Sequence, residues 1–171
     1  MFNKTLASFV AVLFGFMSIG YLAANTNDYS PVPSSPDTRV AFIGEIYDRG
    51  NGTFALDADF IEWYEGEDAD RIFLEREADS GLDGPPDGYY IVNDEIDVQR
   101  LTVAPDAEVY MQLYDRTGNI VEADIVWNER IGVRKFVSLF ADGAAMNMRE
   151  YPYHLTIENG VVTRITQQYI P

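Results

Sequence analysis

The sequence YHLTIENGVVTRI, residues 153–165, decides the fold class of this chain. Two runs of alternating side chains flank Asn159-Gly160, the residue pair that favours a type I′ turn. Such a turn joins adjacent antiparallel strands, so we predict a β-hairpin formed by Tyr153–Glu158 and Val161–Tyr169.

Alternation along this hairpin predicts which side chains share a face of the sheet. Successive side chains of a strand point to opposite faces. Pairing across the turn should therefore place His154 and Thr156 on one face together with Thr163, and Tyr153 and Leu155 on the other. The second face, which is the more apolar, is the candidate core face.

Short strand-like segments continue through the rest of the body. Alternating or apolar runs predict strands at Val40–Tyr47, Thr53–Trp63, Tyr89–Asn93, Gln99–Ala104 and Glu108–Tyr114. We expect Pro105-Asp106 to break the last two apart, because proline cannot donate a ladder hydrogen bond.

Two segments have the spacing of helices. Glu67–Asp79 begins with acidic residues and repeats apolar side chains at helical intervals, and Arg134–Ala141 is a shorter candidate. Many short strands, Gly and Pro turns and one or two short helices indicate a mainly β (α+β) domain. We expect a small antiparallel barrel or rolled sheet behind an N-terminal hydrophobic helix.

The N-terminus differs in character from the body. Thr5–Ala24 contains no charged residue, and a helix of about 20 residues spans about 30 Å, the thickness of a membrane's hydrocarbon core. Residues 1–24 therefore predict a transmembrane anchor or a cleaved signal peptide. Lys4 before the apolar stretch and Asp28 after it favour a cytoplasmic N-terminus with the body outside.

The domain organisation follows from this leader. Residues 25–38 are rich in Pro, Ser and Asn and predict a linker. Residues 39–171 form one acidic, β-rich extracytoplasmic domain. We expect the protein to be anchored to the cytoplasmic membrane by the N-terminal helix, or secreted if the leader is cleaved.

Charge and cysteine content exclude several functions. The chain has 28 acidic and 12 basic residues, a net charge of −16, and no basic stripe, so nucleic-acid binding is not expected. It contains no cysteine, which excludes disulfides, thiolate catalysis and zinc–thiolate sites.

Several stretches resemble a group of small, mostly uncharacterised exported bacterial proteins. The matching pieces are DFIEW (59–63) followed by GEDA (66–69), PPDGYYIVN (85–93), YHLTIENGVVTRI (153–165) and QYIP (168–171). The most specific is the closing hairpin, Y-x-L-T-I-x-N-G-x-V-T-x-I. The resemblance implies an extracytoplasmic domain behind a signal or lipid anchor, although this chain lacks an anchor cysteine. The group has no activity to carry over.

Catalytic side chains are sparse. His154 is the only histidine, and no Gly-x-Ser-x-Gly elbow is present, so nothing predicts a nucleophile next to a base. Asp57, Asp59 and Glu62 are carboxylates close in sequence, the residue type that hydrolyses glycosides in pairs. Among 28 acids such neighbours arise by chance, so we assign no catalytic residue and the sequence favours a non-enzyme.

A calcium site is the metal hypothesis that the sequence raises. Asp48 and Asn51 lie in a Gly-rich turn, and Asp57 and Asp59 follow shortly after it. Calcium takes about six to eight oxygen ligands, which acidic turns can supply. The spacing is not that of an EF-hand. These four residues are the candidate ligands, and no other cofactor is expected.

The leading functional hypothesis is non-enzymatic binding at the cell envelope, to an envelope protein or a glycan. Many Tyr and Trp residues support it, because these side chains are enriched at interfaces, although they also fill small β cores. Two alternatives stay open: a cation (calcium)-responsive structural domain, and a carboxylate-dependent envelope hydrolase. The membrane, through the N-terminal helix, is the other expected partner.

Overall fold

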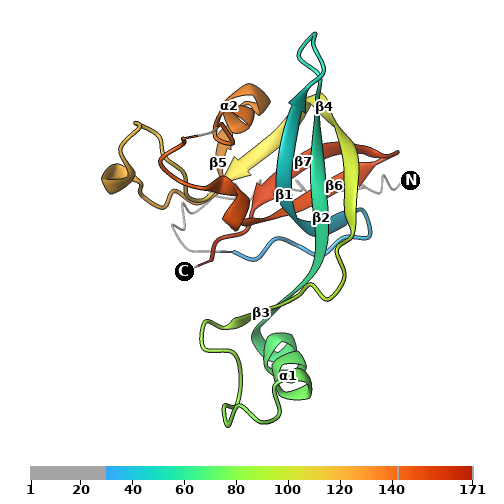
Figure 1. Cartoon of the computed structure of the whole chain (residues 1–171), viewed down its shortest axis with the longest axis vertical. Coiled ribbons are helices and arrows are strands. Elements are labelled where there is room, and N and C mark those ends of the chain that lie inside the picture. The colour runs from blue at the N-terminus through green and yellow to red at the C-terminus, as the bar shows by residue number, and fades with distance from the viewer. Residues whose placement is uncertain (1–29, 142, 171) are drawn as a thin grey trace, which may run out of the picture.

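The computed structural model describes residues 30–141 and 143–170 (Figure 1). The predicted N-terminal hydrophobic helix lies outside these residues. Within them, no helix has the length and apolar character needed to cross a membrane.

Five strands close into a barrel. They are β1 (Thr38–Asp48), β2 (Phe54–Glu65), β4 (Val98–Met111), β6 (Pro152–Glu158) and β7 (Val161–Gln167). Around the barrel the order is β1-β2-β4-β7-β6 and back to β1, with antiparallel neighbours except for the parallel pair β4 and β7. The expected mainly β fold is confirmed, and the parallel pair departs from an all-antiparallel sheet.

Strand β4 makes closure of the barrel possible. Val98–Val103 pairs with β2, and Thr102–Tyr110 pairs with β7. The register shifts between Val103 and Glu108, around Pro105, so the proline sits where the ladder is already irregular. The predicted break at Pro105-Asp106 is therefore wrong: one bent strand of 14 residues serves both neighbours.

The C-terminal hairpin forms as predicted, with a change of register. Asn159 and Gly160 have φ of 51° and 79°, the left-handed backbone that a type I′ turn requires. The ladder shifts between Thr156 and Ile157, so Thr156 pairs with Arg164 instead of Thr163. The predicted placement of Thr163 beside His154 and Thr156 is wrong, because alternation assumes that no residue is bulged.

The barrel encloses the hydrophobic core. Its buried side chains include Ile43, Leu56, Val109, Leu155 and Ile165. Helix α2 (Val133–Ser138) overlaps the predicted helical segment Arg134–Ala141 but begins one residue earlier and ends three residues sooner. It packs Phe136 into the same cluster. Its neighbours in the chain are the short strand β5 (Glu129–Ile131), paired with β4, and the 3₁₀ turns η1 (Ile120–Glu122) and η2 (Met148–Glu150).

A lobe projects from the barrel, as Figure 1 shows at its lower end. It comprises the far end of β2, helix α1 (Gly66–Arg76) and strand β3 (Tyr89–Val92), which pairs with β2. Helix α1 is shorter than predicted, because Glu77 already leaves helical geometry. Residues 62–97 hold thirteen acidic and two basic residues, a net −11 of the chain's −16. The excess negative charge is therefore concentrated in the lobe.

Candidate functional site

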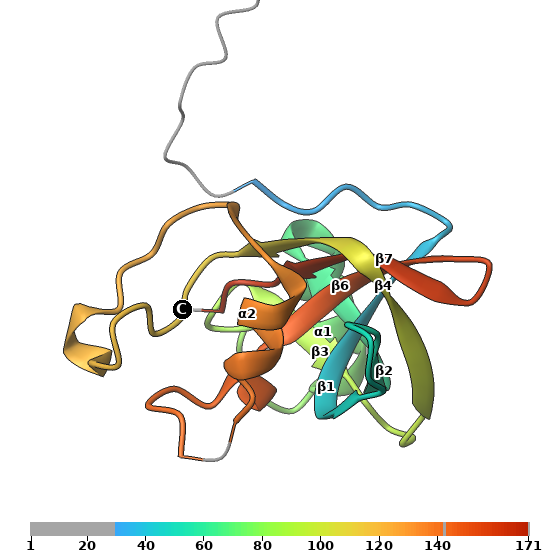
Figure 2. The same ribbon diagram turned by 90° about the horizontal axis from the view of Figure 1, so that it is seen from above.

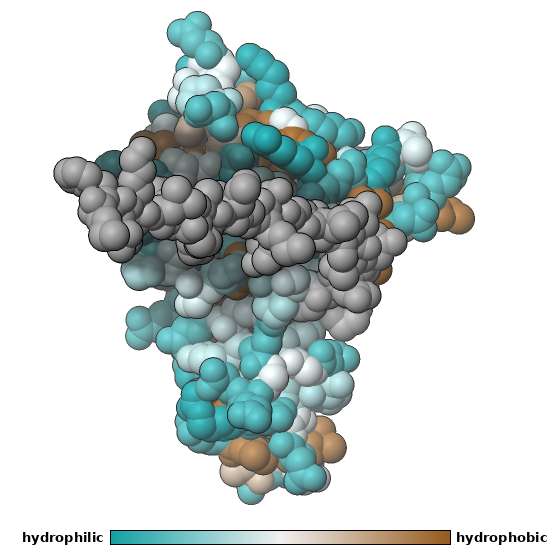
Figure 3. Space-filling model, turned by 180° about the vertical axis from the view of Figure 1, so that it is seen from behind, coloured by the Kyte–Doolittle hydropathy of each residue, from teal (hydrophilic) through white to brown (hydrophobic). Residues whose placement is uncertain are grey.

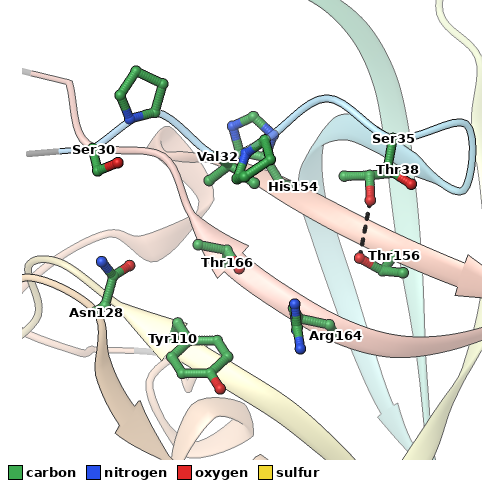
Figure 4. Close-up of a pocket in the computed structure, with 12 residues that line it drawn as sticks. Ser30, Val32, Ser35, Thr38, Tyr110, Asn128, His154, Thr156, Arg164 and Thr166 are labelled. Carbon is green, nitrogen blue, oxygen red and sulfur yellow. Dashed lines mark hydrogen bonds between the residues drawn. The ribbon is translucent and has the colours of Figure 1, made fainter. Parts of the chain in front are cut away.

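A pocket of about 410 Å³ lies on the outer face of the barrel, between the strands and the segment that precedes β1 (Figure 4). Strands β4, β6 and β7 supply its floor. We call it the outer-face pocket. Its lining residues are Ser30, Pro31, Val32, Pro33, Ser35, Thr38, Tyr110, Asn128, His154, Thr156, Arg164 and Thr166.

Strand register places the floor residues side by side. His154 of β6 lies opposite Thr166 of β7, and Thr166 lies opposite Tyr110 of β4. One step along the ladder, Thr156 lies opposite Arg164. Core residues alternate with these positions, so the five side chains share the outward face of three neighbouring strands.

The segment of residues 30–37 forms the other wall of the pocket. Figure 2 shows it running along the barrel before it enters β1. It is fixed near its end, where the Ile157 amide donates to the Asp37 carbonyl at 2.8 Å. The hydroxyls of Thr38 and Thr156 also bond each other at 3.0 Å. The described part of the predicted linker is therefore attached to the barrel.

His154 is a structural histidine of this pocket. Its Nε2 lies 2.8 Å from Oε1 of Gln168, an atom that can only accept, so Nε2–H is the donor. No serine or threonine hydroxyl bonds to the ring within the described residues. Burial lowers the pKa of His154, although the Gln168 hydrogen bond and the Glu65 carboxylate act in the opposite direction. The ring is therefore neutral near pH 7.

The lowered pKa of His154 predicts a loss of stability on mild acidification. Between the unfolded pKa, near 6.5, and the lower folded pKa, the unfolded chain binds one proton more than the folded chain. We expect the free energy of unfolding to fall as the pH drops from about 7 through this window, and the contribution of His154 to this decrease to end below its folded pKa. Urea unfolding at a series of pH values measures it.

The variant His154→Gln is the control for this pH dependence. It lacks the only histidine of the chain, so the decrease between about pH 7 and 5 should disappear. Hydrogen bonds from arginine or glutamine lower the pKa of carboxyl groups such as Asp57 and Asp97. Their protonation therefore reduces the free energy of unfolding only at lower pH. An equal decrease in both proteins would contradict the assignment to His154.

Arg164 is the charged group of the pocket, and it is paired. Its Nε lies 3.0 Å from Oε2 of Glu108, and its hydrogen bond lowers the pKa of that carboxyl group. Its guanidinium also lies 5.7 Å from the Tyr110 ring centroid. The charges of Arg164 and Glu108 cancel, so the pocket has no strong electrostatic field of either sign. It presents hydrogen-bonding groups and an aromatic ring instead.

The turn residues proposed as calcium ligands are used locally. Asp48 accepts from the Gly50 amide at 2.7 Å through Oδ1. Asn51 adopts a φ of 55° at the tip of the same turn. These are ordinary contacts of a tight turn, which Asp and Asn make without a metal.

The two strand residues of the calcium hypothesis have other partners. Both carboxylate oxygens of Asp57 bond Arg100, at 2.7 and 2.8 Å, and Oδ2 also accepts from the Tyr47 hydroxyl. Asp59 accepts from the Asn93 amide at 3.1 Å. Residues 30–141 and 143–170 contain no group of three or more His, Cys, Asp or Glu placed to hold a metal ion. Calcium binding there stays a prediction.

Sequence reasoning identified His154 but not the pocket around it. The pocket combines residues from separated segments, and the parallel pairing of β4 with β7 brings Tyr110 beside the hairpin. No local pattern indicates that pairing. The proline-rich composition of residues 31–36 was visible, but it suggested a spacer and not a wall.

Comparisons with known proteins give no relative. No family model matches the chain, and no curated protein and no solved structure matches it significantly. Function is therefore inferred from the pocket, the fold and the charge distribution.

Proposed function

We propose that the protein is a non-enzymatic binding domain, tethered at the outer side of the cytoplasmic membrane, that takes a neutral glycan of the cell envelope into the outer-face pocket. One observation carries this proposal. The chain has 28 acidic residues, yet none of the twelve residues that line the pocket is acidic. The face is neutral in a strongly anionic protein.

The lining chemistry fits a sugar. Hydroxyl and amide side chains can donate to and accept from ring hydroxyls, and Tyr110 offers an aromatic surface with a polar end. The pocket volume of about 410 Å³ lies in the range of small-molecule sites. A phosphate-rich ligand is disfavoured by the net charge of −16.

The contacts of His154 support binding without chemistry. General-base catalysis needs the base within hydrogen-bond reach of the proton that it removes. Here Nε2 bonds the Gln168 amide, and burial lowers the pKa of the ring. Hydrolysis by paired carboxylates gains no support from the pocket, because no carboxylate lines it.

The barrel connectivity supports the ligand class by analogy. A closed barrel in the order β1-β2-β4-β7-β6, with a helix before β6, is the arrangement of OB-type Greek-key barrels. Barrels of that type bind oligonucleotides or oligosaccharides, and the charge disfavours the first. This is an analogy of fold alone, and the pocket here lies over β4, β6 and β7, away from β2.

Titration with neutral N-acetylglucosamine oligosaccharides tests the proposal. We expect the full-length chain in detergent to bind them in isothermal titration calorimetry, and Tyr110→Ala to weaken binding at least tenfold, about 1.4 kcal/mol. Arg164→Gln should weaken it as well, because Arg164 lines the pocket beside that ring.

A second arginine–tyrosine–carboxylate arrangement provides the matched control. Arg100 bonds Asp57 and lies 4.1 Å from the Tyr47 ring centroid, and neither Arg100 nor Tyr47 lines the pocket. Tyr47→Ala and Arg100→Gln should therefore leave the affinity unchanged. Absence of binding by the unaltered chain, or equal losses in both sets of variants, would refute the glycan site.

A further inference from the structure

A loop of strongly apolar character projects from the barrel between β4 and β5. Within residues 119–126, which we call the apolar loop, Ile120, Val121, Ile125 and Val126 have exposed fractions between 42% and 88%. Soluble surfaces rarely gather large aliphatic side chains in this way, and such patches mark interaction sites. In the space-filling view, apolar surface appears at the right-hand edge, where this loop projects (Figure 3).

Hydrogen bonds to backbone atoms of the apolar loop hold it in place. Asn119 caps the η1 turn by accepting from the Val121 amide at 3.2 Å. The Arg116 guanidinium donates to the Asp124 carbonyl at 2.7 Å, and the Val126 amide donates to the Gln112 carbonyl at 2.9 Å. The aliphatic side chains are therefore presented outward by a fold-defined turn, and their exposure is a feature of the folded protein.

The start of the described chain lies beside the base of this loop. Ser30 and Asn128 line the same outer-face pocket, and Asn128 lies two residues after the end of the apolar loop. Residues 25–29 alone separate Ser30 from the apolar stretch Thr5–Ala24. Five residues extend at most about 18 Å, so a leader that spans a membrane would keep this side of the barrel close to the bilayer surface.

We propose that the apolar loop inserts its aliphatic side chains into the outer surface of the cytoplasmic membrane, as a second contact beside the N-terminal anchor. This inference rests on the proposed membrane tether. One anchor leaves a domain free to rotate, and a shallow apolar contact fixes its orientation. Glu122 and Asp124 then stay at the level of the polar headgroups.

The charge distribution favours this loop over the exposed aliphatic side chains of the lobe. Leu74 and Leu82 are also exposed, but they lie in the lobe, where residues 62–97 have a net charge of −11. An anionic lipid surface repels that lobe. From residue 98 onward the chain holds nine acidic and seven basic residues, so the barrel side that includes the apolar loop approaches a membrane at little electrostatic cost.

Single labels on the full-length chain test the proposal, because the protein has no cysteine of its own. Val121→Cys and Ile96→Cys have nearly equal native exposure, 88% and 84%, and each can carry an environment-sensitive fluorophore. In vesicles of phosphatidylethanolamine and phosphatidylglycerol, we expect a blue shift and quenching by nitroxide lipids at position 121. Position 96 should show neither change.

The outcomes separate the loop contact from the tether. Flotation with the vesicles reports the tether, and failure to float would overturn the tether and the loop contact together. A chain that floats but gives equal emission at the two positions would overturn the loop contact alone. A blue shift at position 121 without quenching by lipid would also overturn it, because it would indicate a protein partner or a second copy.

Discussion

Replacing Gln167 by leucine is expected to lower the free energy of unfolding by about 3–5 kcal/mol. The side chain is 1% exposed, and Oε1 accepts from the backbone amides of Gln112 and Leu113, both at 2.8 Å. Its Nε2 donates to the Leu113 carbonyl at 2.9 Å. Leucine has a similar size but leaves these three backbone groups without partners, and each buried loss costs about 1–3 kcal/mol.

Urea unfolding followed by circular dichroism measures this effect. Gln99→Leu is the matched control, because Gln99 is exposed and its side chain bonds the exposed carboxylate of Asp97. That variant should change the free energy of unfolding by less than about 0.5 kcal/mol. A loss below about 1 kcal/mol for Gln167→Leu would show that the strand ends relax and find other partners.

The same amide network connects the strand ends to the outer-face pocket. Gln112 bonds the Gln167 carbonyl through Nε2 at 3.2 Å, and its Oε1 accepts from the Asn128 amide at 2.7 Å. Asn128 lines the pocket beside Ser30. The chain between β4 and β5 is therefore fixed by two buried glutamines, and this position defines both one wall of the pocket and the base of the apolar loop.

These glutamines illustrate what the sequence could not reveal. Alternation predicted the β-hairpin and its apolar face, because inward positions of an isolated strand pair follow a period of two. The predicted strand Val161–Tyr169 contains Gln167 and Gln168, and nothing in its pattern indicates that both are buried. Their burial depends on β4, which is distant in the chain and parallel to β7. The closed barrel brings the end of β4 beside Gln167, where the backbone of Gln112 and Leu113 supplies its hydrogen-bond partners.

The bulges account for the remaining differences. A register shift in β7 moved Arg164 and Thr166 to the outer face, and one in β4 let a single strand pass Pro105. The shift in β7 inverts the alternation beyond it, from Val162 to Ile165 in the core, so a local pattern cannot follow that strand through it. The shift in β4 changes which residues of β7 it pairs with. The floor of the pocket depends on both shifts, which is why the fold class was predictable and the pocket was not.

Truncating Phe136 to alanine is the second change with a large expected effect. The ring is 1% exposed and packs edge-on against Phe140 and Tyr153, with centroid separations of 5.1 and 5.6 Å. The contact with Tyr153 of β6 holds α2 on the barrel core. Removing a buried phenylalanine side chain leaves a cavity and typically costs about 3–5 kcal/mol. We expect a loss of that size in the free energy of unfolding, measured in urea.

Two further variants separate packing of the ring from helix formation. Lys135→Ala changes the adjacent, exposed position of α2 and should have little effect, because alanine forms helices at least as well as lysine. Phe136→Leu keeps most of the apolar volume and should lose less than the alanine variant. If Lys135→Ala were as damaging as Phe136→Ala, the loss in the phenylalanine variant could not be assigned to the burial of Phe136 against the barrel.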